Sequence, residues 1–263
     1  MIHQTAIISP TAKIGKNVKI GPYSIVGDNV KLSDDVEIMS HVCIDGYTSI
    51  MEGTKIFPFA TIGYSPQDLK FKGEKSRLII GKRNIIREYV TMHPGTEGGT
   101  AETVIGNNNL FMIGVHVAHD CIVGSDVVMG NNATLGGHVE VEDCVIIGGL
   151  AAIHQKVRIG YGSIIGGMSG VERDVIPYGV VKGERAHLYD INIIGLRRAG
   201  VARHEILALK KAYDIIFSRE ETTMLKHIEA VEKTVQGLPC VDRLIRFMKS
   251  DTNRSFCFPK EQQ

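Results

Sequence analysis

The chain has 263 residues, of which 43% are hydrophobic and 22% charged, so it can bury a substantial core as one large or two smaller domains. Its formal net charge of +1 argues against a protein whose main task is to coat nucleic acid, because such binding requires a strong basic excess. Residues 1–6 lack the features of a signal peptide and no apolar run approaches the roughly 18 residues of a membrane span, so we expect a cytoplasmic protein without a membrane span.

The first part of the chain has a period of six. A helix would show apolar spacings of three and four, and a hairpin sheet would alternate with a period of two. A period of six instead predicts a parallel β-helix, in which short strands stack about 4.8 Å apart around one core. The aliphatic positions of this first series are Ile2, Ile8, Ile14, Ile20, Val26, Leu32, Ile38, Ile44, Ile50, Ile56 and Ile62.

The six-residue periodicity is interrupted near residues 64–79 and again near 94–104, where we expect two loops to project from the coil. Between them it resumes briefly, and after the second loop it runs without interruption. We therefore assign residues 1–189 to the β-helix, whose handedness the periodicity does not define. The later aliphatic positions are Ile80, Ile86 and Met92, and then Ile105, Phe111, Val117, Val123, Met129, Leu135, Val141, Ile147, Ile153, Ile159, Ile165 and Val171.

Beyond residue 190 the apolar spacing becomes helical. We expect about three helices, which form a small α-helical C-terminal domain over residues 190–263. Their apolar faces are Ile206, Leu209, Tyr213 and Ile216; Met224, Ile228, Val231 and Val235; and Val241, Leu244, Ile245 and Met248.

Titratable residues gather at one place in the repeat. Three hexads make one triangular turn, so positions one full turn apart should lie above one another. Asp120 then stacks on His138, while His119 stacks on Gly137 and, one turn further, on Gln155. The full predicted cluster is His116, His119, Asp120, Gly137, His138, His154 and Gln155.

Such a cluster supports general base catalysis. A histidine titrates near neutral pH, and a neighbouring carboxylate can fix its tautomer and stabilise the imidazolium that forms. The backbone N–H of Gly137 could stabilise an oxyanion. Cys121 falls on an inward position, so no nucleophile pairs with the cluster, and direct transfer to a bound hydroxyl is more natural than a covalent intermediate.

Two other classes of protein remain open. Three histidines can bind zinc, and the His116-x-x-His119 spacing permits a zinc-dependent carbonic anhydrase of the γ type, by analogy with trimeric β-helix enzymes. A structural or adhesive β-solenoid is the second, although such scaffolds usually carry polar ladders rather than clustered histidines. We favour the base mechanism, with no metal.

Several motifs together resemble the UDP-N-acetylglucosamine O-acyltransferase family of lipid A biosynthesis, and the resemblance runs essentially from end to end. The motifs are Pro66-Gln67-Asp68-Leu69-Lys70, Asn84-Ile85-Ile86-Arg87-Glu88, His116-Val117-Ala118-His119-Asp120, Asn131-Asn132-Ala133-Thr134-Leu135-Gly136-Gly137-His138, Ile153-His154-Gln155 and Gly195-Leu196-Arg197-Arg198.

This resemblance implies a homotrimer of left-handed parallel β-helices, each followed by a helical domain, with active sites between subunits. In that family an R-3-hydroxyacyl group passes from acyl carrier protein to the 3-hydroxyl of UDP-N-acetylglucosamine, as the first step of lipid A biosynthesis. The carrier-protein thioester is the donor, so no cofactor is expected. Another hexapeptide acyl- or acetyltransferase is the alternative within the class.

The resemblance also implies roles for single residues. His119 would be the base, Asp120 its orienting partner and the Gly137 N–H the oxyanion donor. The helical domain, with Arg198 nearby, would help receive the acidic carrier protein. Gly167 and Arg185 would face the acyl chain, and Gly167 would leave room for a long one. The sugar nucleotide would be held by Asp68, Lys70, His116, His138, His154 and Gln155, and its uridine and phosphate end by Asn192 and Arg198.

Overall fold

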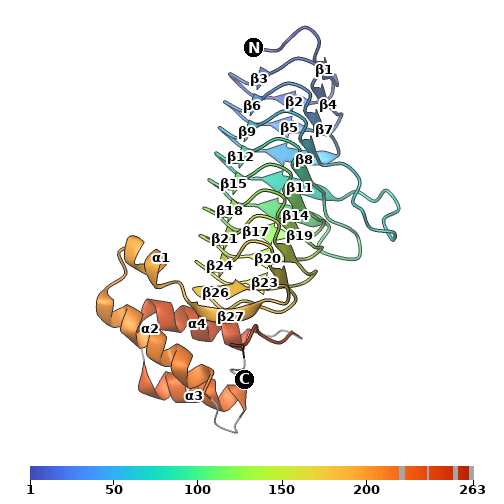
Figure 1. Cartoon of the computed structure of the whole chain (residues 1–263). Helices are drawn as coiled ribbons and strands as arrows, with labels where there is room; N and C mark the ends of the chain where they lie inside the picture. The colour runs from blue at the N-terminus through green and yellow to red at the C-terminus, as the bar shows by residue number, and fades with distance from the viewer. Residues whose placement is uncertain (219–222, 236, 251–253, 261–263) are drawn as a thin grey trace.

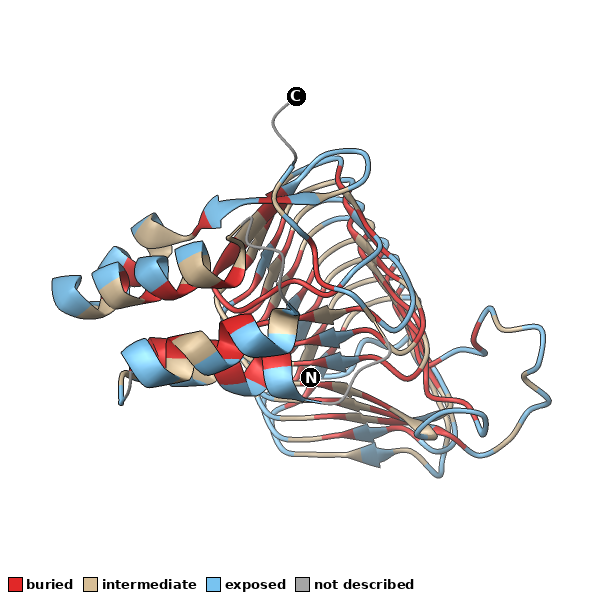
Figure 2. Cartoon of the chain, turned by 90° about the horizontal axis from the view of Figure 1, so that it is seen from below, coloured by how far each residue is buried: buried red, intermediate tan, exposed pale blue. Residues whose placement is uncertain are grey.

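The computed structural model describes residues 1–218, 223–235, 237–250 and 254–260. Its main body is a tall coil with the helices packed at the C-terminal end (Figure 1). Seen along the coil axis, the body is three-sided, with buried residues lining its interior (Figure 2). The chain therefore forms the β-helix followed by helices that the sequence predicts.

Each turn of the coil adds one strand to each of three sheets, which contain nine, eight and ten strands within the described residues. The first sheet is β1 (Ile7–Ile8), β4 (Ile25–Val26), β7 (Cys43–Ile44), β10 (Thr61–Ile62), β13 (Thr91–Met92), β16 (His116–Val117), β19 (Thr134–Leu135), β22 (Ala152–Ile153) and β25 (Gly170–Val171). The second sheet is β2 (Lys13–Ile14), β5 (Lys31–Leu32), β8 (Tyr47–Ile50), β11 (Arg77–Ile80), β14 (Glu102–Ile105), β17 (Ile122–Val123), β20 (Glu140–Val141) and β23 (Arg158–Ile159). The third sheet is β3 (Lys19–Ile20), β6 (Glu37–Ile38), β9 (Lys55–Ile56), β12 (Ile85–Ile86), β15 (Leu110–Phe111), β18 (Val128–Met129), β21 (Ile146–Ile147), β24 (Ile164–Ile165), β26 (Gly179–Lys182) and β27 (His187–Ile191).

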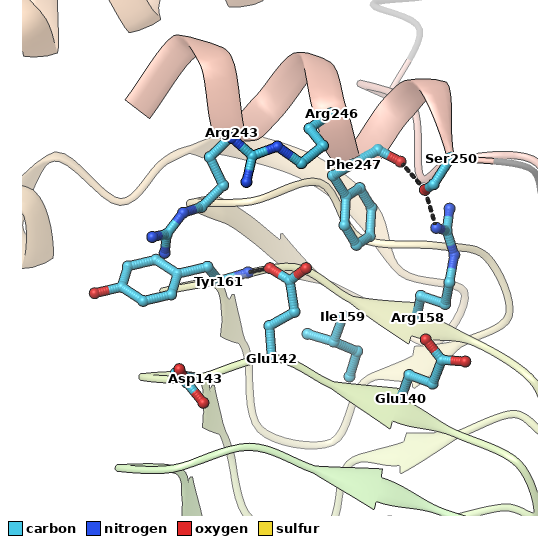
Figure 3. A pocket seen from close by; sticks show the side chains of 10 residues that line it. All are labelled: Glu140, Glu142, Asp143, Arg158, Ile159, Tyr161, Arg243, Arg246, Phe247 and Ser250. Carbon is cyan, nitrogen blue, oxygen red and sulfur yellow. Dashed lines mark hydrogen bonds between the residues drawn. The ribbon is translucent and has the colours of Figure 1, made fainter. Parts of the chain in front are cut away.

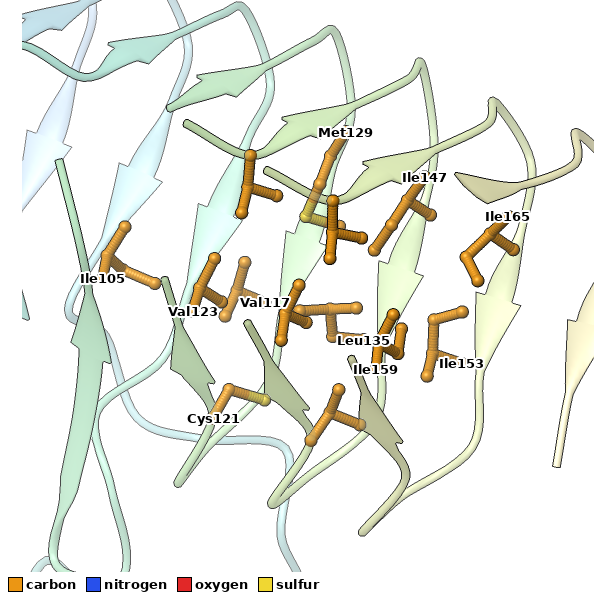
Figure 4. Close-up of a cluster of buried hydrophobic side chains, with 14 of the residues drawn as sticks. Ile105, Val117, Cys121, Val123, Met129, Leu135, Ile147, Ile153, Ile159 and Ile165 are labelled. Carbon is orange, nitrogen blue, oxygen red and sulfur yellow. The ribbon is translucent and has the colours of Figure 1, made fainter. Parts of the chain in front are cut away.

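Almost all of the aliphatic hexad residues are buried or partly buried inside the coil, as predicted, whereas Ile2 in the first turn is 50% exposed. From β1 to β25, wherever no loop intervenes, strands pair in parallel with the strand three hexads further along the chain, as in His116 with Thr134. The β-branched and aliphatic side chains stack into one continuous core (Figure 4). Cys121 is fully buried in this core, which confirms its inward position.

The coil is left-handed, opposite to the usual hand of parallel crossovers. At its corners many non-glycine residues adopt left-handed backbone angles. Asp120, His138 and Lys156, for example, have φ values of 59°, 60° and 64°. These three occupy the same position in successive turns, between the first and second sheets. We call this edge, with His119, Asp120, Gly137, His138, His154 and Gln155, the histidine corner.

Both predicted loops project from the coil (Figure 1). One connects β10 to β11 and the other connects β13 to β14. β11 begins at Arg77 and β14 at Glu102, so the chain rejoins the coil slightly before each expected loop end. Both connections run from the first to the second sheet, so both loops leave from the histidine corner.

The C-terminal part contains the three expected helices, α2 (Arg203–Ile216), α3 (Met224–Thr234) and α4 (Pro239–Lys249). They are preceded by a short helix, α1 (Ile193–Arg198), that the apolar spacing did not predict. β27 pairs antiparallel with β26 and extends to Ile191, slightly beyond the residue where helical spacing was expected. Within the described ranges no helix is both long and apolar enough to cross a bilayer.

Candidate active site

His119 lies just after β16, in the turn of the histidine corner. Its Nδ1 is 2.8 Å from Oδ2 of Asp120. A Cβ placed on Gly137, in the next coil, would be 2.6 Å from Cε1 and 2.7 Å from Nε2 of His119. The ring is therefore held by Asp120 on one side, and its Nε2 faces the backbone of Gly137.

Asp120 is buried, and the second loop anchors it. Thr96 donates its N–H to Oδ1 (3.1 Å) and its hydroxyl to Oδ2 (2.7 Å), and the Thr100 N–H donates to Oδ1 (2.9 Å). Burial alone would raise the pKa of Asp120, but the hydrogen bonds from His119 and Thr96 outweigh it and hold the pKa below its usual value. The ionised carboxylate can only accept hydrogen bonds, so Nδ1 of His119 carries the proton and Nε2 is left free as a base.

Gly137 is buried against the His119 ring. Any side chain at this position would collide with the imidazole, so only glycine fits. Its N–H donates to no acceptor in the part of the chain that the structure describes, although its carbonyl accepts from the Lys156 N–H at 2.9 Å. An unpaired N–H beside a free imidazole nitrogen is the arrangement that stabilises an oxyanion next to a general base.

Three further histidines surround His119. The His138 ring meets that of His119 edge-on, with centroids 5.0 Å apart. His116 bonds through Nδ1 to the Thr91 hydroxyl at 2.7 Å, and its ring contacts that of His93 at 4.9 Å. Burial, and then the neighbouring histidines, lower the pKa of His93 to about 4 and also lower that of His116. Both rings are therefore neutral at pH 7.

The remaining sugar-nucleotide candidates lie around this centre. Burial lowers the pKa of His138, although the charges of Asp120 and Asp68 oppose the shift. Asp68 belongs to the first loop, which leaves the coil at the histidine corner between β10 and β11. The exposed Lys70 donates its N–H to Asp68 at 3.0 Å. His154 and Gln155 occupy the same corner one coil beyond Gly137.

Four predicted site residues lie away from His119 in the single chain. Gly167 is at the corner between the third and first sheets, where it lines a cavity of about 1140 Å³ together with Arg185. Arg185 pairs with Glu172 at 2.8 Å. Asn192 caps α1 by accepting from the Gly195 N–H at 2.8 Å, and Arg198 is exposed at the end of that helix. One chain therefore unites the base and its neighbours but not the predicted acyl and nucleotide-end contacts.

Sequence periodicity missed several residues of the site. His93, Thr96 and Thr100 belong to or border a loop, where the regular spacing does not apply. Thr91 and His116, which lie on either side of the second loop in the sequence, pair in the first sheet. If the loop had been treated as an insertion in the repeat, this register would have placed His93 beside His116. Nothing in the pattern marks Arg254, which contacts His154 from the end of the chain.

One group of side chains in the histidine corner could in principle bind zinc. Among the described residues, His119, Asp120 and His138 offer ligand atoms within 4.8 Å of one another. His116, which the sequence pattern offered as a zinc ligand, is not part of this group and bonds to Thr91 instead. Asp120 already accepts hydrogen bonds at both oxygens, so a metal would have to displace them. The geometry favours a base over a metal centre.

The fold and these groups define a transferase built on hexapeptide repeats. The family model for bacterial transferase hexapeptide repeats matches residues 11–46 and 102–137, and that for the second domain of UDP-N-acetylglucosamine O-acyltransferase matches residues 174–257. The chain belongs to the UDP-N-acetylglucosamine O-acyltransferase family, as its similarity to whole members of that family shows.

Among curated relatives, the acyl-[acyl-carrier-protein]--UDP-N-acetylglucosamine O-acyltransferase of Caulobacter vibrioides is 49% identical over 99% of both chains. That of Sinorhizobium fredii is 45% identical over 98% of this chain and 95% of its own. A crystal structure of a UDP-N-acetylglucosamine acyltransferase superimposes with a TM-score of 0.95 at 41% identity, covering 99% of this chain and 100% of the other. The enzyme of Arabidopsis gives a TM-score of 0.86 at 33% identity, covering 98% and 100%.

Proposed function

We propose that this enzyme transfers an R-3-hydroxyacyl group from acyl carrier protein to the 3-hydroxyl of UDP-N-acetylglucosamine, the first step of lipid A biosynthesis. The relatives named above carry the activity in their names. The observation that carries the proposal is the pairing of His119 with Asp120 opposite the unpaired N–H of Gly137.

The chemistry follows from the positions of these groups. Nε2 of His119 removes the proton from the sugar hydroxyl as the oxygen attacks the thioester carbonyl. The Gly137 N–H donates to the oxyanion that develops on the carbonyl oxygen. As the C–S bond breaks, the imidazolium returns its proton to the leaving thiolate, so the products are an ester and the free carrier thiol. Asp120 stabilises the imidazolium meanwhile.

A homotrimer explains why one chain holds only part of the predicted site. Gly167 lies at the corner between the third and first sheets, and the same corner exposes a column of apolar side chains. Such a column is typical of a surface that another subunit covers. We infer that this corner of one subunit faces the histidine corner of the next. The exposed column includes Phe59, Tyr89, Leu150 and Met168.

The same arrangement would complete substrate binding. Asp68, Lys70, His116, His138, His154 and Gln155 would hold the sugar nucleotide from one subunit, with Asn192 and Arg198 of the neighbour at its uridine and phosphate end. Gly167 and Arg185 would line the path of the acyl chain. We place the enzyme in the cytoplasm, with a carrier-protein thioester as donor and no cofactor.

The first test is direct. The purified enzyme, incubated with R-3-hydroxyacyl carrier protein and UDP-N-acetylglucosamine, should yield a sugar nucleotide heavier by one hydroxyacyl group and an equal amount of free carrier thiol, as measured by mass spectrometry. The rate should be unchanged after treatment with a chelator, because no step needs a metal. One tightly bound zinc per subunit and chelator-sensitive activity would contradict the proposal and favour the zinc class.

The carrier protein has a suitable docking surface on the helical domain. A groove of about 440 Å³ runs between α1 and α2, with an apolar floor, a basic rim and no acidic residue among those that line it. This charge suits an acidic partner. The lining residues are Ile193, Arg197, Val201, Arg203, Ile206, Leu207 and Lys210.

Reversing two charges of this groove should weaken carrier binding. We expect Arg203→Glu combined with Lys210→Glu to raise the KM for the carrier-protein thioester about tenfold, because rim charges steer association. The KM for the sugar nucleotide should not change. Lys226→Glu, on the exposed face of α3, is the matched control, and an equal effect of this control would show that only net charge matters.

A further inference from the structure

The C-terminal tail, residues 254–260, returns from the helical domain to the coil. Asp174 donates its N–H to the carbonyl of Ser255 at 3.0 Å and accepts from the Cys257 N–H at 2.8 Å. Leu188 donates its N–H to the carbonyl of Phe258 at 2.9 Å. Cys257 is 2% exposed. The tail is therefore fixed along the last coils rather than lying free.

The end of α4, just before the tail, is also fastened to the coil. Arg158 on β23 donates to the Ser250 hydroxyl at 2.5 Å, and its guanidinium lies 4.5 Å from the ring centroid of Phe247. The Ser250 hydroxyl in turn donates to the carbonyl of Phe247 at 2.6 Å. Figure 3 shows these groups meeting between α4 and the coil. The contacts of Ser250 before Arg254 and of Ser255 and Cys257 after it therefore hold Arg254 close to the last coils.

Arg254 spans two coils at the histidine corner. Its Nη1 donates to the carbonyl of Glu172 at 2.7 Å, and its Nη2 donates to the carbonyl of Gln155 at 2.5 Å. The same Nη2 lies 3.0 Å from Nδ1 of His154. His154 and Glu172 hold equivalent positions in successive turns, so the guanidinium bridges neighbouring coils and ends on a predicted substrate-binding side chain.

The contact between Arg254 and His154 favours one tautomer of the His154 ring. A guanidinium donates hydrogen bonds and never accepts them, so a hydrogen bond between Nη2 and Nδ1 requires a lone pair on Nδ1. Nη2 also donates to the carbonyl of Gln155. Nδ1 of His154 also lies 3.1 Å from that carbonyl. Without Arg254, the ring would donate from Nδ1 to Gln155 and leave Nε2 bare.

We propose that Arg254 is a positioning residue for His154, which it holds in the Nε2–H tautomer so that the ring offers a hydrogen-bond donor to an oxygen of the sugar nucleotide. The identity of the ligand as a sugar nucleotide rests on the proposed function, whereas the assignment of the tautomer rests on the geometry alone. The C-terminal tail thereby takes part in acceptor binding.

Nitrogen NMR of histidine-labelled enzyme tests the tautomer directly. The His154 signal, assigned by its loss in His154→Ala, should show Nε2–H in the wild type and Nδ1–H in Arg254→Ala. Arg254→Lys keeps a cationic donor and should retain Nε2–H. Arg246→Ala, which removes an exposed arginine from α4, is the control and should change nothing. The same tautomer in the wild type and Arg254→Ala overturns the proposal.

A double-mutant cycle tests the consequence for binding. Arg254→Ala should raise the KM for the sugar nucleotide about fivefold, the worth of one hydrogen bond, with little change in kcat. In the His154→Ala background the same substitution should have no further effect. An equal loss in both backgrounds would show that Arg254 acts independently of His154 and would overturn the proposal.

The reactivity of Cys257 distinguishes positioning from loss of the tail. Mass spectrometry after alkylation should find this thiol as protected in Arg254→Ala as in the wild type. If Cys257 becomes reactive in Arg254→Ala, the tail has detached, and Arg254→Lys then tests the tautomer because it keeps the charge near Glu172. A lysine variant in which Cys257 stays protected but His154 carries its proton on Nδ1 contradicts the proposal. Absence of transfer by the wild type would overturn the proposed function and leave the NMR result standing.

Discussion

Replacing His119 by alanine should lower kcat about 1,000-fold or more, because it removes the group in position to take the proton of the attacking hydroxyl. Nε2 of this ring is oriented by Asp120 and faces Gly137, and the neighbouring His116 bonds to Thr91 instead. The KM for the sugar nucleotide should change much less, since the base acts mainly in the transition state. Initial rates at saturating carrier thioester measure both constants.

The matched control is His3→Ala, which removes an exposed histidine in the first coil, far from the histidine corner. It should keep full activity. His119→Ala should keep the same mass in solution and lose only about 1–2 kcal/mol of its free energy of unfolding, because it removes the hydrogen bond between Nδ1 and the buried Oδ2 of Asp120 but no side chain of the apolar core. A folded His119→Ala enzyme within tenfold of wild-type activity would remove His119 from the role of base.

The architecture was predictable because one physical rule repeats along the chain. Outside the two loops, an apolar residue at every sixth position from Ile8 to Val171 has to point inward, and the structure buries almost all of them. Handedness does not follow from that rule, since a period of six fits a coil of either hand. It follows from the family resemblance. α1 was missed because so short a helix does not show a helical period.

The site was predictable where it shares the same repeat. The three-hexad turn places Asp120 on His138 and His119 on Gly137, and the structure brings these four together. Thr96 and Thr100 approach from an aperiodic loop. Their contacts depend on how that loop folds back, which a repeat cannot specify. Arg254 lies far from His154 in the sequence, and its contact depends on the path of the whole helical domain.

Replacing Asp120 by asparagine should lower kcat about 1,000-fold while changing the KM values little, because it reverses the tautomer of the base. Oδ1 accepts from two backbone N–H groups, of Thr96 and Thr100. The new amide must therefore keep its oxygen there and turn its NH2 toward His119. Nδ1 of His119 then accepts instead of donating, so the proton moves to Nε2 and no free base remains.

The stability should change far less than the rate. We expect the free energy of unfolding to fall by about 1–2 kcal/mol, the worth of the charge-assisted hydrogen bonds that are weakened, when both proteins are compared at equal subunit concentration. Asp126→Asn is the matched control, since Asp126 holds the same left-handed turn position at the next corner and is exposed. Nitrogen NMR should show His119 with Nδ1–H in the wild type and Nε2–H in Asp120→Asn. If Asp120→Asn instead retained the wild-type tautomer and rate, His119 would be a base that needs no carboxylate partner.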